Sequence, residues 1–383
     1  MKIVYLYTAL TTIGGADRII VQKANYLADV YKHDIYIITD SQNKRPFSFP
    51  LSRNVKHIDL DINFDKQYKY NLLIRYFVYK SLMIKYKKKL LLCLNKIKPQ
   101  ITISTLGRDM DFLTDLNDGS KKVAESHIAR HYMRNLHLME AKGGISKVIA
   151  KYWRKKQEKA IKKLDALVVL TKADADHWKE IKQKFIIPNP ITLEPNGYST
   201  CTGNKIISVG RLTEQKGYDL LINAWKAIAF KHPDWIINIY GEGELHDKLQ
   251  QQICDSHLEK QIILCKPVTN ISEKYIESSF YVMSSRFEGF GLVLTEAMCC
   301  GLPCISFNCP SGPSEIIKDK EDGLLVENGN INALADSICF MIEHEEKRIQ
   351  MGKKAKGNVM RYSTEHIMQQ WNELFKGLIQ KQQ

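Results

Sequence analysis

The sequence predicts an α/β protein of two doubly wound, Rossmann-like domains, each with a parallel sheet, facing a central cleft. Three observations lead to this prediction. The chain has 383 residues, which is long for a single hydrophobic core. Short apolar runs alternate with segments of helical periodicity along its whole length, as in successive βα units. The prolines in Pro188-Asn189-Pro190 and the polar stretch 194–204 separate two such series, which indicates a linker between two domains.

The first domain is expected to span residues 1–190. It begins with an apolar run at 3–7, a glycine loop at 11–16 and a helix with apolar residues at helical spacing. This order of strand, loop and helix starts a doubly wound domain. The loop lacks the G-x-G-x-x-G pattern, so a nicotinamide cofactor is not expected. Further strands are predicted at 34–39, 55–60, 101–104, 121–125 and 166–170.

The second domain is expected to span residues 191–362. Apolar runs again alternate with glycine-containing loops and helical segments, which predicts a second parallel sheet. Its strands are predicted at 205–209, 235–240, 262–265, 280–283 and 303–307. An isolated amphipathic helix is predicted in the last segment, 363–383.

Positive charge is concentrated in the first half of the chain. The formal net charge is +14, and residues 1–195 contain 36 Lys and Arg against 19 Asp and Glu. Such asymmetry predicts an anionic partner, either a membrane surface or nucleic acid. No zinc-finger, RNP or homeodomain pattern accompanies the charge, so nucleic acid is not expected.

Two basic segments are predicted to be helices, one at 66–98 and one at 146–163. The first interleaves ten Lys and Arg with tyrosines and aliphatic residues. Basic amphipathic helices with aromatic side chains lie on anionic membranes, which is the partner we expect. The alternative is a pair of ordinary domain helices with solvated charged faces.

Cysteine usage indicates a cytoplasmic protein, and the two basic helices lead us to expect that it is peripheral on the inner face of the cell membrane. The nine cysteines are an odd number and are scattered, as in a reducing compartment. The cluster at Cys299, Cys300, Cys304 and Cys309 matches no paired C-x-x-C zinc pattern. No apolar run reaches 18 residues, so a membrane-spanning helix is not expected.

The stretch 286–298 has the strongest pattern of a binding site. Gly289 and Gly291 allow a tight turn, and Leu292 and Val293 begin a helix whose N-terminus suits a phosphate. Carboxylates would repel a phosphate, so Glu288 and Glu296 are expected to accept hydrogen bonds from neutral hydroxyl groups. A sugar nucleotide offers both chemistries. The alternative is a capped loop with two solvated acids.

Three further places are candidates for the same chemistry. Arg211 and Lys216 flank a glycine-bounded loop after a strand, where they could clamp a diphosphate or form a surface salt bridge. Backbone N–H groups at Gly14 and Gly15 could approach a phosphate, or the pair could simply form a turn. His127 follows the strand predicted at 121–125, at the edge where α/β proteins bind ligands, although a lone histidine is often structural.

Taken together, these motifs resemble the retaining GT-B glycosyltransferases of family 4. The likeness covers nearly the whole chain in the right order. Cys309–Ile317 looks like the bacterial surface-polysaccharide subgroup, whose acceptors are lipid-linked. The motifs are Gly14-Gly15-Ala16, Val209-Gly210-Arg211-Leu212 with Lys216-Gly217, the E-x7-E pair Glu288 and Glu296, and Gly323-Leu324-Leu325-Val326.

The resemblance implies a retaining hexosyltransferase that needs neither a metal nor a cofactor. Its donor would be a nucleotide sugar, expected to be UDP-linked. Its last helix would return to the first domain. The resemblance also implies a role for each candidate residue. Arg211 and Lys216 would hold the donor diphosphate, helped by N–H groups of Gly15 and of Gly291 to Val293. Glu296 would bind the ribose, Glu288 the transferred sugar, and His127 would lie near the reacting carbon. The base would be flanked by the region of Gly241, Glu242 and Val268, and the loop around Gly289 and Phe290 would complete the donor site.

One departure and two alternatives remain open. The family often has a glycine before the position of Val268, where this chain has Lys266-Pro267, which puts the base contacts in doubt. A UDP-sugar epimerase with the same fold is the second interpretation of the motifs. A non-enzymatic basic binding protein is the third.

Overall fold

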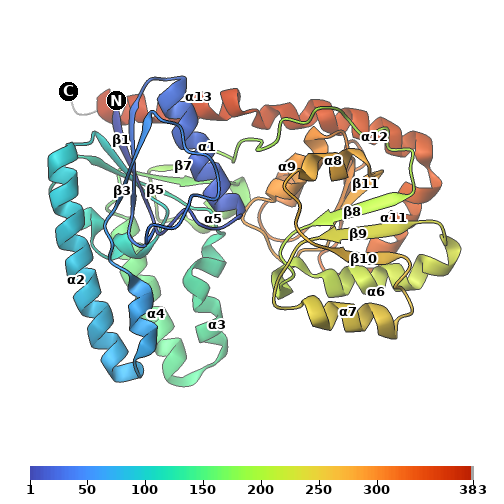
Figure 1. The fold of residues 1–383 in the computed structure, drawn as a ribbon, viewed down its shortest axis with the longest axis horizontal. Coiled ribbons are helices and arrows are strands. Elements are labelled where there is room, and N and C mark those ends of the chain that lie inside the picture. Colours follow the sequence, from blue (N-terminus) through green and yellow to red (C-terminus); the bar gives the residue numbers. More distant parts are fainter. Residues whose placement is uncertain (381–383) are drawn as a thin grey trace. The chain divides into compact units, whose positions relative to one another are not determined.

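The computed structural model describes residues 1–380, apart from the side chains of Leu72, Arg134, Asn135 and Ile145. The chain forms two compact units (Figure 1). Unit 1 comprises 1–170, 174–187 and the segment from Ile367 onward, and unit 2 comprises 171–173 and 188–366. The predicted divisions, 190/191 and 362/363, differ from these by a few residues.

Residues 171–173 lie between two segments of unit 1 but belong to unit 2. The sequence did not predict this assignment. The carboxylate of Glu315 accepts hydrogen bonds from the backbone N–H groups of Lys172 and Ala173, each at 2.9 Å. These bonds satisfy orphan donors at the start of α5 (Lys172–His177).

Unit 1 contains a seven-stranded parallel sheet in the order β3-β2-β1-β4-β5-β6-β7. The predicted strands are present with boundaries that match within one residue. β7 was not predicted: it is short, and Phe185 and Ile186 within it are partly exposed, so it lacks the apolar run of a buried strand. The strands are β1 (Lys2–Tyr7), β2 (Asp34–Thr39), β3 (Val55–Asp59), β4 (Ile101–Ser104), β5 (Lys121–Glu125), β6 (Ala166–Val169) and β7 (Lys184–Ile186).

The helices of unit 1 cover both faces of this sheet, because right-handed crossovers run from the central strand β1 toward both edges. They are α1 (Gly15–Asp29), η1 (Phe64–Lys69), α2 (Leu72–Ile97), η2 (Arg108–Asp111), η3 (Leu113–Asp115), η4 (Arg130–Asn135), α3 (Leu136–Ala141), α4 (Gly144–Ile161), the α5 segment from Asp174, and α13 (Thr364–Gln380) from Ile367 onward.

The single basic helix predicted at 66–98 is wrong in one respect. The chain leaves the 3₁₀ helix η1 at Tyr70, and Asn71 then caps α2 by accepting a hydrogen bond from the Ile74 N–H at 3.1 Å. Asparagine is a preferred N-cap, so a new helix starts there. Within α2, Met83, Tyr86, Leu90 and Leu94 recur at helical spacing and are buried in the core of unit 1. The second basic segment, predicted at 146–163, is α4.

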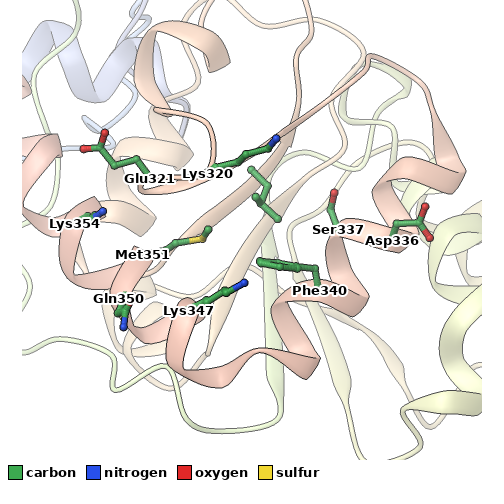
Figure 2. A pocket seen from close by; sticks show the side chains of 10 residues that line it. Lys320, Glu321, Asp336, Ser337, Phe340, Lys347, Gln350, Met351 and Lys354 are labelled. Carbon is green, nitrogen blue, oxygen red and sulfur yellow. The ribbon is translucent and has the colours of Figure 1, made fainter.

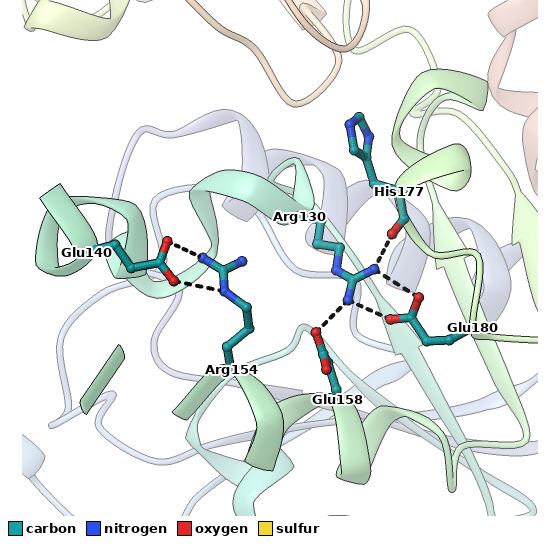
Figure 3. A network of polar contacts seen from close by, with 6 residues as sticks. All are labelled: Arg130, Glu140, Arg154, Glu158, His177 and Glu180. Carbon is teal, nitrogen blue, oxygen red and sulfur yellow. Dashed lines mark hydrogen bonds and ion pairs between the residues drawn. The ribbon is translucent and has the colours of Figure 1, made fainter. Parts of the chain in front are cut away.

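Part of the charge on α4 is already paired. Arg154 forms a two-point contact with Glu140 on α3, at 3.1 and 2.9 Å (Figure 3). Nearby, Arg130 contacts Glu158 on α4 at 2.7 Å and Glu180 at 2.5 Å, and it also donates to the backbone oxygen of His177. These pairs fix α3 and α4 to the unit. Lysines of α4 such as Lys147 and Lys151 remain on its exposed face.

Unit 2 contains a six-stranded parallel sheet in the order β10-β9-β8-β11-β12-β13. β13 coincides with the predicted family motif at Gly323–Val326, which the sequence did not identify as a strand. The strands are β8 (Lys205–Val209), β9 (Ile236–Tyr240), β10 (Ile262–Cys265), β11 (Phe280–Met283), β12 (Cys304–Phe307) and β13 (Gly323–Val326).

The helices of unit 2 follow these strands in alternation, and their apolar faces form its core with Trp225 and Trp235. They are η5 (Glu214–Lys216), α6 (Tyr218–Ile228), η6 (Ala229–Lys231), α7 (His246–Asp255), α8 (Ile271–Ile276), α9 (Leu292–Cys299), α10 (Pro313–Ile316), α11 (Ile331–Glu343), α12 (Glu345–Asn358) and η7 (Val359–Tyr362). Over residues 1–380, no helix has the length and apolar character needed to cross a membrane.

Candidate active site

Most of the predicted site residues lie at one edge of the unit 2 sheet. The carboxyl ends of parallel strands meet at a common edge, and the loops that leave them carry the ligand groups of α/β folds. The residues are Arg211 and Lys216 after β8, Gly241 and Glu242 after β9, Val268 after β10, and Glu288, Gly289, Phe290, Gly291, Leu292, Val293 and Glu296 after β11.

Backbone hydrogen bonds join these loops to one another. The Gly210 N–H donates to Tyr240 O at 3.0 Å, and the Gly241 N–H donates to Cys265 O at 3.0 Å. The glycines are needed for this close approach, because a Cβ on Gly241 would stand 1.9 Å from Gly210 O. Any side chain at Gly241 would therefore force the loops after β8 and β9 apart.

The loop after β8 is also braced to the loop after β11. Arg286 forms a two-point ion pair with Asp219, at 2.8 and 2.7 Å, and its guanidinium donates to Glu214 O at 2.9 Å. Gly217 has a φ of +61°, and a Cβ there would stand 2.1 Å from Ser284 O. These contacts hold the two loops together and therefore fix the backbone positions of Lys216 and Glu288.

Lys216 and Glu288 are brought together by this bracing. The Lys216 Nζ lies 2.7 Å from Glu288 Oε1, and the two side chains are only 15% and 8% exposed. The sequence predicted that both would contact the donor, but not that they would pair with each other. Because the pair is largely shielded from water, each charge stabilises the other more than in a surface salt bridge.

Arg211 differs from Lys216 in being exposed. No hydrogen bond or ion pair of its guanidinium is found among the described residues. Glu242 is also exposed, and Val268 is 41% exposed in the loop after β10. These three side chains line the same edge as the Lys216–Glu288 pair and are accessible to a ligand.

The helix α9 begins at the predicted position. Gly291 is its N-cap with a φ of +99°, a left-handed conformation that favours glycine. The N–H groups of the first turn, including those of Leu292 and Val293, point along the start of the helix toward the same edge. Phe290 is buried against Tyr362, with ring centroids 5.4 Å apart, and anchors the turn.

Glu296 is buried on α9, where other side chains donate hydrogen bonds to its carboxylate. Its Oε1 accepts a hydrogen bond from the Thr192 hydroxyl at 2.5 Å, and Oε2 accepts one from Tyr275 at 3.4 Å. The sequence did not indicate either partner, because both lie far along the chain from Glu296. They hold the carboxylate in an acceptor orientation, as its predicted role in binding hydroxyl groups requires.

The remaining predicted residues lie in unit 1. Gly14 is the N-cap of α1 and Gly15 is its first, exposed residue, after β1. Asp17 in the first turn closes this loop: its carboxylate accepts hydrogen bonds from the Thr12 N–H at 2.9 Å and the Tyr7 hydroxyl at 2.7 Å. Gly15 itself stays accessible at the carboxyl edge of the unit 1 sheet.

His127 follows β5 at the same edge of that sheet and sits beside a buried ion pair. Its Nε2 lies 3.2 Å from Glu125 Oε1, and this oxygen also contacts Lys23 Nζ at 2.5 Å. Burial lowers the pKa of His127, with Glu125 opposing and Lys23 adding to the shift. The imidazole is therefore neutral at pH 7.

Lys23 and Glu125 form a charge pair in the core of unit 1. Their side chains are 1% and 0% exposed, and the Lys23 ammonium lies 3.6 Å from the ring centroid of Trp371 on α13. Burial lowers the pKa of Lys23 to about 8 despite the nearby carboxylate. Burial alone would raise the pKa of Glu125, but the charge of Lys23 and the hydrogen bond from it hold this pKa below its usual value.

The structure thus groups the predicted residues in two sets. The unit 2 set shares one sheet edge, whereas Gly14, Gly15 and His127 share an edge of unit 1. Completion of one site across a cleft between the two units stays a prediction.

Several residues that shape the site were not predicted. Arg286, the first residue of the stretch 286–298, braces this stretch through Asp219, and Thr192 orients Glu296. Nothing in the sequence beyond its charge indicated the role of Arg286. Its partner is 67 positions away and could not be inferred.

A separate cavity lies elsewhere in unit 2. It has a volume of about 600 Å³ and is bounded by α11, α12 and β13 (Figure 2). Phe340 and Met351 form its apolar part, and Lys320, Lys347 and Lys354 surround it. None of the predicted site residues lines it.

Two Rossmann-like units, with a glycine-rich, charged strand edge suited to a nucleotide diphosphate in the second, are the features expected of a sugar-transferring enzyme. Residues 199–358 match the family model described as Glycosyl transferases group 1. This part of the chain is therefore similar to the group 1 glycosyltransferases, and the chain as a whole has the GT-B fold.

Three similar proteins illustrate this relationship. An uncharacterized glycosyltransferase of Haemophilus influenzae is 29% identical over 97% of this chain and 98% of its own. A poly(ribitol-phosphate) alpha-N-acetylglucosaminyltransferase of Staphylococcus aureus is 34% identical over 58% of this chain, but this covers only 46% of that protein. A solved structure of S. aureus TarM with UDP and alpha-GlcNAc-glycerol has a TM-score of 0.76, with 19% identity, 98% coverage of this chain and 99% of that chain.

Proposed function

We propose that this protein is a retaining, metal-independent hexosyltransferase of family 4. It moves a hexose or N-acetylhexosamine from a nucleotide sugar, which we take to be UDP-linked, to a lipid-linked or polysaccharide acceptor in bacterial surface-glycan synthesis. The observation that carries the proposal is that the largely buried Lys216–Glu288 pair and the exposed Arg211 lie at the sheet edge where α9 begins. UDP in the TarM structure and the poly(ribitol-phosphate) in the name of the S. aureus relative support the donor and acceptor classes.

The proposed chemistry follows from the charges at this edge. The donor diphosphate would bind Arg211, Lys216 and the first-turn N–H groups of α9, all of which stabilise negative charge. Lys216 would turn from Glu288 toward the phosphate, which frees the carboxylate to accept hydrogen bonds from the transferred sugar. Glu296, held by Thr192 and Tyr275, would accept the ribose hydroxyls.

Retention would follow from attack on the face that the diphosphate leaves. The departing phosphate would take the acceptor proton, so no protein base is needed, and preorganised positive charge at the leaving group would be the main catalytic effect. Neutral His127 would donate or accept a hydrogen bond at the sugar without adding charge.

A donor screen tests the reaction. We expect the purified protein to transfer sugar from one of a panel of UDP- and GDP-sugars to a short lipid-linked acceptor, detected by mass spectrometry, with the anomeric configuration retained by NMR. Conversion of free donor into an epimer without acceptor would instead show the epimerase. No donor consumption, together with tight and salt-dependent binding to duplex DNA, would favour the basic binding protein.

We further propose that α2 and α4 contact an anionic membrane surface at the inner face of the cell membrane. Both helices begin at the carboxyl edge of the unit 1 sheet, and their first halves extend on the same side of it in Figure 1. Large apolar side chains there are exposed to water, namely Leu73 (79%), Phe77 (70%) and Tyr76 (54%) on α2 and Val148 (67%) and Tyr152 (64%) on α4. Exposed apolar groups among lysines suit the boundary between head groups and acyl chains.

Vesicle binding tests this surface. Leu73→Ser combined with Phe77→Ser should weaken sedimentation with phosphatidylglycerol-containing vesicles at least ~10-fold, because two apolar anchors are lost. The matched control is Leu92→Ser, which removes an apolar residue that is 62% exposed from the other end of α2. Wild-type protein that binds neutral vesicles as well as anionic ones, or a double variant that binds like wild type, would refute the proposal.

A further inference from the structure

Three side chains with metal-binding chemistry converge at one end of unit 2. These side chains belong to His232, Cys339 and Glu343. In the described part of the chain, residues 1–380, their ligand atoms lie within 4.8 Å of one another. None of them belongs to the candidate active site. They offer one nitrogen, one sulfur and one oxygen.

The local structure presents these groups to a common point. Cys339 and Glu343 are four residues apart on α11, so they lie on the same face of the helix, one turn apart. His232 comes from the turn between η6 and β9, which follows α6, and α11 packs against α6. The carboxyl end of α11 lies at Glu343, where the helix dipole favours a cation.

His232 has an unsatisfied polar atom aimed at this point. Its side chain is 9% exposed, and Nε2 is buried without a hydrogen-bond partner. Nε2 lies 3.6 Å from Glu343 Oε1, too far for a hydrogen bond. A buried nitrogen without a partner is costly, and a cation between the two atoms would satisfy both of them.

The distance between His232 and Glu343 suits a small divalent ion. Ligands bonded to Zn²⁺ at 2.0 to 2.3 Å in a tetrahedron stand roughly 3.3 to 3.7 Å apart. The His232–Glu343 separation of 3.6 Å already has this value. Thiolate and imidazole together select zinc over calcium or magnesium, which prefer oxygen ligands.

We propose that His232, Cys339 and Glu343 bind Zn²⁺, with water as the fourth ligand on the exposed side of Glu343. The thiol proton is released to solvent on binding, so the sulfur coordinates as thiolate. Lys231 is the neighbouring positive charge that opposes the ion, and Asp336 and Glu343 are the negative charges that favour it.

The position of this site gives it a structural role. α6 and α11 begin after β8 and β13 at the carboxyl edge of the sheet, so the far end of α11 and the turn after α6 lie at the opposite edge from Arg211 and Lys216. Zinc there would tie the end of α11 to the turn that leads into β9. Bound zinc would therefore stabilise unit 2. It would take no part in the chemistry at the other edge, which depends on protein side chains alone.

Cobalt spectroscopy on the untagged, chelator-treated full chain tests this site. Titration with Co²⁺ should give a near-ultraviolet thiolate-to-metal charge-transfer band that saturates at one ion per chain and disappears when Zn²⁺ is added. Cys339→Ser should abolish the band, and Cys339→Ser and His232→Gln should each weaken Zn²⁺ binding in calorimetry at least ~100-fold, since each loses one of three protein ligands.

The matched control is Cys254→Ser, which changes another half-buried cysteine of unit 2, on α7. It should keep the band and the affinity of the wild type. Zn²⁺ should also raise the Tm of the wild type and of this control, but not of Cys339→Ser. A wild-type protein without the band, or a Cys339→Ser variant that retains it, would overturn the proposal.

Discussion

Lys216→Ala and Arg211→Ala are each expected to lower the rate of sugar transfer at least ~100-fold, because each removes positive charge from the position of the leaving diphosphate. The two variants differ in their side effects. Lys216 pairs with Glu288 at 2.7 Å, so its loss also leaves a largely buried carboxylate without its cation. Arg211 is exposed, so Arg211→Ala should lose activity without losing stability.

The comparison of these variants isolates the catalytic effect. Steady-state transfer and thermal unfolding are measured together for both, for Glu288→Ala and for the control Lys226→Ala, which removes an exposed lysine from α6. Glu288→Ala should also lose at least ~100-fold through loss of sugar positioning. Near-normal turnover in well-folded Arg211→Ala and Lys216→Ala would show that the diphosphate does not bind here.

Lys23→Met is expected to lower the free energy of unfolding by about 3–5 kcal/mol, because it leaves Glu125 charged and buried without its partner. The methionine keeps the apolar stem against Trp371, so lost packing contributes little. The double variant Lys23→Met/Glu125→Leu removes both charges and should be destabilised much less than Lys23→Met. Urea unfolding measures both.

The control for this prediction is Lys179→Met, which changes an exposed lysine of the same unit and should lie within about 0.5 kcal/mol of the wild type. If Lys23→Met is no more destabilised than this control, the buried pair does not stabilise the docking of α13. A double variant as unstable as the single one would point to packing rather than charge.

The fold could be predicted because its strands are local patterns. β2, β4, β5, β8, β10 and β11 lie at the predicted residues, since each is a short apolar run between turn signals. The strand and the helix start that were not predicted have equally local causes. β7 has exposed side chains, and the break before α2 depends on the cap made by Asn71, which a run of lysines and tyrosines obscures.

The site could be predicted only in part, because its contacts are not local. Glycine positions and charged residues placed Arg211, Lys216 and Glu288 at the same edge. The pairing of Lys216 with Glu288 spans 72 positions, and the Thr192–Glu296 bond spans 104. Such contacts depend on how the loops pack, which no periodicity in the sequence records. For the same reason the zinc ligands, 107 positions apart from His232 to Cys339, had no sequence pattern.

Hydrogen exchange of the full chain with and without UDP tests the central claim most directly, because it locates the nucleotide without assuming an acceptor. The account predicts slower amide exchange at 210–217, 241–244 and 288–296, the loops after β8, β9 and β11. Protection confined to the cavity lined by Phe340 and Met351, or protection absent from these loops while UDP is bound, would contradict it.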